Sequence, residues 1–130
     1  MADPLKICVV DDEQIVCERI KPILEKSGFV VETFTESASA LKRLSETAFH
    51  ILITDIKMGQ PDGLELLRYT RSHAPSTRVI IITGFATAES AREAMKSGAV
   101  DFIAKPFRLS HLTDLVMNLA KEIQGGDAAR

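Results

Sequence analysis

The sequence predicts a single α/β domain built around a parallel sheet. Five short apolar segments, rich in β-branched residues, alternate with segments whose apolar residues recur at helical spacing. Strands and helices that alternate in this way form a parallel sheet covered by helices on both faces. The length of 130 residues suits one such domain with a single hydrophobic core.

Composition and charge fit an ordinary globular protein. Hydrophobic residues make up 45% of the chain and charged residues 26%. The formal net charge of −2 indicates no basic face for nucleic acid. The apolar segments are too short to cross a bilayer, and the first residues lack a secretory signal, so we expect a cytoplasmic protein without membrane contact. Cys8 and Cys17 are accordingly expected to be reduced thiols in or near the core.

The order of the elements follows from the two periodicities and from turn residues between them. The strands are expected at 6–10, 29–34, 51–55, 78–82 and 101–104. The helices are expected at 15–24, at 38–44, from 64 onward, at 87–97 and at 109–123. We expect the domain to cover residues 1–124, and residues 125–130, which begin with two glycines, to form a flexible tail or the start of a linker.

Several residues indicate how the helices are shaped and where they end. Pro22 lies inside the first helix, where it removes a hydrogen bond, so we expect either a bend there or a Glu18 carbonyl that is bound by water. Thr35 or Ser37 is expected to cap the second helix and Asp62 the third, because their oxygens accept free N–H groups of a first turn. Gly98 is expected to close the fourth helix in the left-handed conformation.

Polar side chains follow four of the five predicted strands. Right-handed crossovers leave few topologies, and five such units most often take the strand order 2-1-3-4-5 with a crevice between strands 1 and 3. Strand 1 is followed by Asp11 and Asp12, strand 3 ends at Asp55, strand 4 is followed by Thr83, and strand 5 by Lys105. Because the carboxyl ends of parallel strands meet at one edge, we expect these five side chains to lie together.

These residue types have a shared chemical logic. Three carboxylates in one crevice repel one another unless a cation lies among them, and Mg²⁺ is typically held by one or two carboxylates with phosphate and water. A lysine supplies positive charge for a phosphate oxygen, and a threonine a neutral donor. The pattern therefore predicts a phosphoryl-transfer site with a carboxylate nucleophile. The alternative is that Asp55 is an ordinary turn or capping residue.

The same residues carry a resemblance to a known family. The chain resembles, over about residues 5–123, the receiver domain of bacterial two-component response regulators, which has a flavodoxin-like, doubly wound five-stranded sheet. The motifs that carry it are Val9-Val10-Asp11-Asp12-Glu13, Asp55-x-x-Met58-(x)4-Gly63, Thr83-Gly84 and Lys105-Pro106-Phe107. The segment from Ala86 to Ala99 resembles receivers attached to σ54-dependent transcriptional activators.

The resemblance implies the residues that hold the metal and the phosphoryl group. Asp55 would accept a phosphoryl group from a sensor histidine kinase. Asp12 and the backbone carbonyl of Lys57 would bind Mg²⁺ together with Asp55, and Asp11 would help through water. The family commonly has proline after the methionine at position 58, whereas this chain has Gly59, so we expect a looser loop there.

The resemblance also implies how the phosphoryl group is detected. Lys105 would contact a phosphate oxygen, and Thr83 would donate its hydroxyl to the phosphoryl group. Phe102 matches an aromatic switch position that is often tyrosine, and without a hydroxyl it would respond by packing alone. The fourth helix, the fifth strand and the last helix would then be the surface for a homodimer or another partner.

The expected function is a phosphorylation-activated signalling switch that catalyses only its own phosphorylation and dephosphorylation. Any effector would lie outside this chain, and we expect no direct binding of nucleic acid. Two alternatives stay open: a receiver-like scaffold that is not phosphorylated, and a nucleotide- or flavin-binding domain, which would need a glycine-rich loop after the first strand. The three histidines, His50, His73 and His111, lack metal-ligand spacing and are expected to have no functional role.

Overall fold

The computed structural model describes residues 3–56 and 59–128, with side chains described up to residue 125. Within these residues, five strands alternate with five helices. The strands are β1 (Lys6–Val10), β2 (Val30–Phe34), β3 (Ile51–Asp55), β4 (Arg78–Thr83) and β5 (Asp101–Ala104). The helices are α1 (Gln14–Lys26), α2 (Ser37–Glu46), α3 (Gly63–His73), α4 (Ala88–Lys96) and α5 (Leu109–Ala128).

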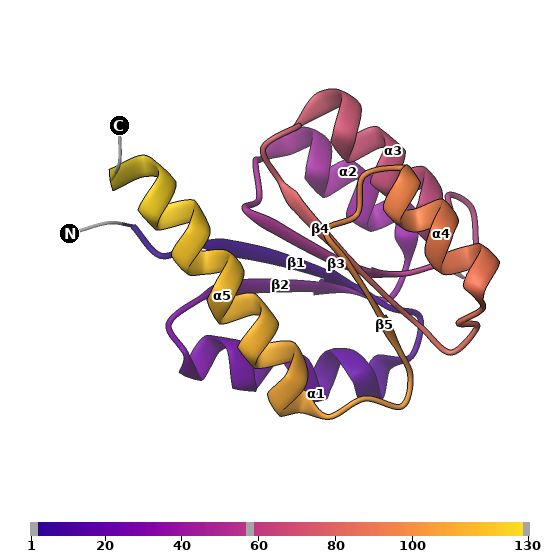
Figure 1. Cartoon of the computed structure of the whole chain (residues 1–130), viewed down its shortest axis with the longest axis horizontal. Coiled ribbons are helices and arrows are strands. Elements are labelled where there is room, and N and C mark those ends of the chain that lie inside the picture. Colours follow the sequence, from indigo (N-terminus) through magenta and orange to yellow (C-terminus); the bar gives the residue numbers. More distant parts are fainter. Residues whose placement is uncertain (1–2, 57–58, 129–130) are drawn as a thin grey trace.

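The strands form one parallel sheet in the order β2-β1-β3-β4-β5, which confirms the predicted topology. Helices α1 and α5 cover one face of the sheet, and α2, α3 and α4 cover the other (Figure 1). Val9 of β1 pairs with Ile53 of β3, which pairs with Ile80 of β4. In this register the carboxyl ends of the central strands reach one edge of the sheet.

The sheet separates two apolar cores. Side chains of one parity, such as Ile7, Val9 and Ile53, pack against α1 and α5, and those of the other parity, such as Cys8 and Leu52, pack against α2, α3 and α4. All five of these side chains are fully buried, and each large one contributes about 1.5–3 kcal/mol to folding. Burial on both faces explains why these strands are continuous apolar runs without alternation.

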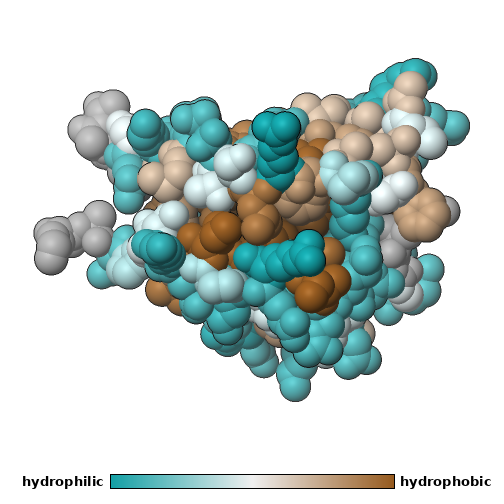
Figure 2. Space-filling view, turned by 90° about the horizontal axis from the view of Figure 1, so that it is seen from below, coloured by the Kyte–Doolittle hydropathy of each residue, from teal (hydrophilic) through white to brown (hydrophobic). Residues whose placement is uncertain are grey.

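The outer surface on the side of α1 and α5 contains both apolar and hydrophilic areas (Figure 2). Seen from the side that carries α1 and α5, apolar side chains gather in the middle of the surface and hydrophilic ones surround them (Figure 2). An open groove of about 440 Å³ lies between the first turns of α1 and the segment that joins β5 to α5. Of the helices described, none offers an apolar stretch that could span a bilayer.

The helix ends follow the sequence signals in α3 and α4 but not in α2. Asp62 caps α3 in a capping box with Glu65, and Gly98 follows α4 with φ of +108°. The prediction that Thr35 or Ser37 caps α2 was wrong, because Glu36 is at the cap position and makes no side-chain capping bond. Ser37 is instead the first helical residue and is buried, so its packing outweighs its preference for a cap.

Helices α1 and α5 contain the two remaining sequence signals. Pro22 lies inside α1, and the bend expected there stays a prediction. Helix α5, however, continues to Ala128, past the helix end expected at residue 123. A flexible tail or linker start at residues 125–130 stays a prediction. Glycine costs a helix only about 1 kcal/mol relative to alanine, and this segment contains no proline to stop it. A domain limit at residue 124 stays a prediction.

Candidate functional site

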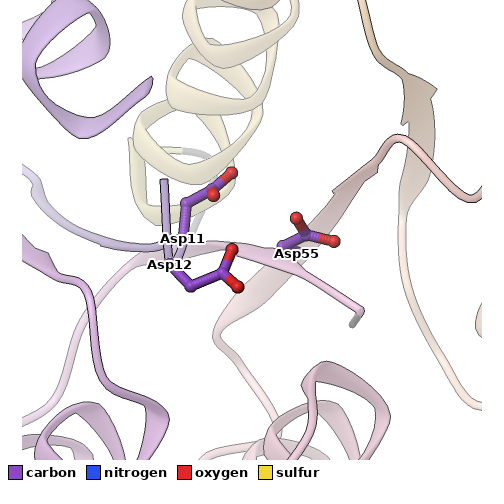
Figure 3. Close-up of side chains that lie close together, drawn as sticks. All are labelled: Asp11, Asp12 and Asp55. Carbon is purple, nitrogen blue, oxygen red and sulfur yellow. The ribbon is translucent and has the colours of Figure 1, made fainter. Parts of the chain in front are cut away.

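Three carboxylates converge where β1 and β3 end. Asp11 and Asp12 directly follow β1, and Asp55 is the last residue of β3. One carboxylate oxygen from each lies within 4.8 Å of the others, and Figure 3 shows the three side chains directed toward a common space. Asp11 and Asp55 are buried, whereas Asp12 is exposed. We call these three residues the acidic cluster.

Lys105, which follows β5, places its ammonium group against the acidic cluster. Among the described residues, Nζ lies 2.7 Å from Oδ2 of Asp11, 2.9 Å from Oδ2 of Asp55 and 2.7 Å from Oε1 of Glu13. Burial by itself lowers the pKa of Lys105, but the three carboxylates outweigh burial and raise it above its ordinary value. Lys105 is therefore a fixed positive charge at neutral pH.

Asp11 is the most enclosed member of the acidic cluster. Its Oδ1 accepts a hydrogen bond of 2.9 Å from the backbone N–H of Glu13. Its buried Oδ2 forms an ion pair with Lys105 that lacks the direction of a good hydrogen bond. Burial raises the pKa of Asp11, and the contact with Lys105 only partly opposes that effect. A second cation beside Asp11 would therefore be stabilising.

The backbone of Asp55 is held by the start of α3. The N–H of Gly63 donates to the carbonyl of Ile56 at 2.9 Å, and Thr54 Oγ1 donates to the Asp55 carbonyl at 2.9 Å. A Cβ atom on residue 63 would overlap the carbonyl oxygen of Asp55. Only glycine lets the helix approach the strand this closely, which sets where the Asp55 carboxylate emerges.

Thr83 and Phe102 lie on the two neighbouring strands. Thr83 is fully buried at the end of β4, and its Oγ1 accepts a hydrogen bond of 3.0 Å from the N–H of Phe85. The Thr83 carbonyl accepts from the N–H of Lys105 at 2.8 Å, so the two residues are linked through the backbone. Phe102 is partly buried and packs against the core beneath α2, α3 and α4.

The structure thus brings Asp11, Asp12, Asp55 and Lys105 together, as the sequence predicted, with Thr83 linked to Lys105 from the neighbouring strand. Lys57, expected to provide a carbonyl ligand, lies outside the described residues, as does the first part of the loop expected to be loose.

Glu13 has no role predicted from the sequence, although it is adjacent to Asp12 in the chain. Its partner Lys105 is 92 residues away, so only the fold reveals the contact. The acidic pattern that continues from Asp11 and Asp12 into Glu13 was the one available signal.

Both cysteines and two of the three histidines have ordinary structural surroundings. Cys8 and Cys17 are buried free thiols, as expected. His50 accepts a hydrogen bond from the N–H of Lys6 at 2.9 Å, and His73 stacks on Tyr69. Among the described residues, the group of potential metal ligands contains carboxylates and no histidine.

The donor set fits a hard divalent cation. Carboxylate oxygens are the ligands that Mg²⁺ prefers, and an exposed Asp12 beside a buried Asp55 leaves one side of the cluster open to water. The cluster holds three negative charges and Lys105 only one positive charge. The arrangement can therefore bind a metal ion and, next to it, a phosphoryl group.

Comparisons with known proteins agree with this geometry. The family model of the response regulator receiver domain matches residues 7–117. The transcriptional regulatory protein ZraR of Klebsiella oxytoca is 33% identical over 110 residues, which cover 85% of this chain and 25% of that protein. The transcriptional regulatory protein FixJ of Bradyrhizobium diazoefficiens is 31% identical over 118 residues, which cover 91% of this chain and 58% of that protein.

A solved structure extends the comparison. The beryllofluoride-activated NtrC4 receiver domain dimer is 29% identical with a TM-score of 0.84, and the match covers 90% of this chain and 97% of that one. This chain spans only a quarter to somewhat over half of the two curated relatives.

Proposed function

The chain belongs to the response regulator receiver domain family, and on this premise we propose that it is a phosphorylation-activated switch whose phospho-acceptor is Asp55. The observation that carries the proposal is the contact between Asp55 and Lys105 beside two further carboxylates. A nucleophile, a fixed positive charge and a candidate metal site then lie within one crevice.

Asp55 is the best placed nucleophile of the acidic cluster. It ends the central strand β3, and Gly63 fixes its backbone. An oxygen of its carboxylate would form a bond to phosphorus while the bond between phosphorus and the donor's nitrogen breaks, and the donor's imidazole would take up a proton. Asp11 is a poorer candidate because its two oxygens are engaged by Glu13 and Lys105.

Lys105 and Thr83 would stabilise the transferred group. The ammonium of Lys105 already contacts Asp55 and can move to a phosphoryl oxygen that is attached there. The Thr83 hydroxyl lies at the end of the next strand, and its bond to the N–H of Phe85 uses only an acceptor site, so its proton stays available for donation. Both contacts would favour the phosphorylated state electrostatically.

Asp12, Asp55 and, through water, Asp11 would hold Mg²⁺, with the carbonyl of Lys57 as a further proposed ligand. The ion would supply positive charge that offsets repulsion between the cluster and the phosphoryl oxygens. Asp12, whose carboxylate is exposed, would bind that ion directly. We also propose that water later forms a bond to phosphorus while the bond between phosphorus and the Asp55 oxygen breaks. This step would release inorganic phosphate and restore the free carboxylate, so the domain would dephosphorylate itself.

Thr83 ends β4 shortly before α4, and Phe102 lies in β5; from these positions we propose α4, β5 and α5 as the output surface. Movement of Thr83 toward a phosphoryl group would leave space that the Phe102 ring can fill. The NtrC4 relative was solved as a dimer, which supports a homodimer here. We further propose a sensor histidine kinase as the phosphodonor. The proposed effector lies outside this chain and is a transcriptional activator of the σ54-dependent type.

The test is transfer from acetyl phosphate, a small donor that needs no kinase. With Mg²⁺, the intact mass should rise by one phosphoryl group that hydroxylamine removes, and Asp55→Asn should abolish the gain. Labelling of that variant to the same extent, or labelling that survives removal of Mg²⁺ by a chelator, would contradict the proposal. Failure of the wild-type protein to accept any phosphoryl group would favour the unphosphorylated scaffold.

A further inference from the structure

We propose that Glu13 is a positioning residue for Lys105: in the unphosphorylated domain its carboxylate takes the ammonium donor that a phosphoryl oxygen takes after phosphorylation. The inference rests on the proposed function and adds a regulator of the same site. It starts from an ion pair that the proposed mechanism leaves unused, that of Lys105 Nζ with Glu13 Oε1 at 2.7 Å.

The three carboxylates around Lys105 are not equally easy to release. A lysine ammonium has three N–H donors, of which two donate to Glu13 and Asp55, and an ion pair holds the ammonium against Asp11. The side chains of Asp11 and Asp55 are only 0% and 5% exposed, so water has little access to take the place of the lysine at either one. The Glu13 side chain is 56% exposed, and water can replace the lysine there at little cost.

The position of Glu13 in α1 points to the same role. Glu13 is the N-cap residue, yet its side chain makes no capping bond. Its backbone is nevertheless well held, since its N–H donates to Asp11 and its carbonyl accepts from Val16. Ser, Thr, Asp or Asn at this position would stabilise the helix. Glu13 instead directs a longer carboxylate across the site to Lys105.

The Glu13–Lys105 pair is also accessible to an incoming anion. Both residues line the open groove beside the site, together with Gly84 and Phe107. A phosphoryl donor can therefore displace Glu13 without disturbing the core. We therefore expect the Glu13 carboxylate and the phosphoryl group to compete for the ammonium of Lys105. The unphosphorylated domain keeps the Glu13–Lys105 ion pair, and the phosphorylated domain loses it.

The experiment compares Glu13→Gln with the wild-type protein at saturating Mg²⁺, using beryllofluoride as a mimic of the phosphoryl group. The variant keeps the size of the side chain and removes its charge, so it should bind beryllofluoride about two- to fivefold more tightly, the range of an exposed ion pair. The difference should shrink at high ionic strength, because exposed pairs are screened, whereas an effect on packing alone would persist.

Two further variants separate the contact from general charge. Glu18→Gln removes the same charge from an exposed position of the same helix and should bind beryllofluoride like the wild-type protein. Glu13→Asp keeps the charge but is one methylene too short for the contact, so it should bind beryllofluoride more tightly, as Glu13→Gln does.

Equal or weaker binding by Glu13→Gln, or an equal gain in Glu18→Gln, would overturn the role of Glu13. Wild-type behaviour of Glu13→Asp would overturn it as well. If the wild-type protein fails to bind beryllofluoride at all, the proposed function fails and this inference fails with it.

Discussion

Replacing Gly63 by alanine should damage both the fold and the site, because Gly63 lies directly against the backbone of Asp55. The added Cβ would overlap the Asp55 carbonyl oxygen and lie 2.7 Å from both the Asp55 carbonyl carbon and the Ile56 Cα. Carbon atoms in contact prefer about 3.5–4.0 Å. These neighbours are backbone atoms, so no side-chain rotation can relieve the overlap, and α3 and β3 must move apart by about 1 Å.

The expected loss of stability is about 1–3 kcal/mol, the usual cost of inserting a methyl group into a closely packed region. In a domain of this size, that corresponds to a fall in melting temperature of about 3–15 °C. Phosphorylation by acetyl phosphate should slow by tens- to a hundredfold, since a displacement of about 1 Å at a reacting group can cost that much. Thermal unfolding and the rate of mass gain measure the two effects.

Gly125 is the matched control, because a Cβ there meets no atom within 4 Å and the residue lies in α5. Gly125→Ala should raise stability, by up to about 1 kcal/mol, through helix propensity, and leave phosphorylation unchanged. If Gly63→Ala instead matched the wild-type protein in both stability and rate, the close approach of α3 would not set the position of Asp55.

The remaining predictions concern metal binding, pH and output. Asp12→Ala should weaken Mg²⁺ binding by about tenfold or more, which is about 1.4 kcal/mol in a calorimetric titration. It should also stabilise the metal-free domain by relieving repulsion within the cluster. Unchanged Mg²⁺ affinity would exclude Asp12 as a ligand. The hydrogen bond from Arg43 lowers the pKa of Glu32 below its ordinary value of 4.5. The pair therefore stabilises the fold above that pH, and this stabilisation is lost as the pH falls through the lowered pKa. Glu32→Gln should show a smaller acid-induced fall in melting temperature than the wild-type protein, and an identical pH profile would refute the pairing. Beryllofluoride should shift the amide resonances of α4 and β5 in the wild-type protein, including Phe102, and less so in Thr83→Ala; shifts confined to α1 would place the output elsewhere.

The fold was predictable because its signals are local. Strands buried between two helical layers are continuous apolar segments, and Ile51 to Asp55 is one of them. The prediction that a short polar residue caps a helix was also correct at Asp62. Where burial competed with propensity, as at Ser37 in α2, local reasoning failed. The end of α5 was missed because glycine only weakens a helix and does not terminate it.

The candidate site was predictable for a different reason, which is topology. Parallel strands deliver their carboxyl ends to one edge, so Asp11, Asp55 and Lys105 could be grouped before any distance was known. Two features required the structure. The pairing of Glu13 depends on how far a side chain reaches across the crevice, and the need for glycine at position 63 depends on a helix-to-strand distance. Spacing along the chain contains neither quantity.

The identity of the phosphorylated residue is the most direct test of the account. After incubation with acetyl phosphate and Mg²⁺, borohydride reduction converts an aspartyl phosphate to homoserine, and peptide mass spectrometry then locates it. The account predicts homoserine at residue 55 alone, and none when Mg²⁺ is removed by a chelator. Homoserine at Asp11 or Asp12 instead, or at residue 55 without Mg²⁺, would contradict the proposed arrangement of nucleophile and metal ligands.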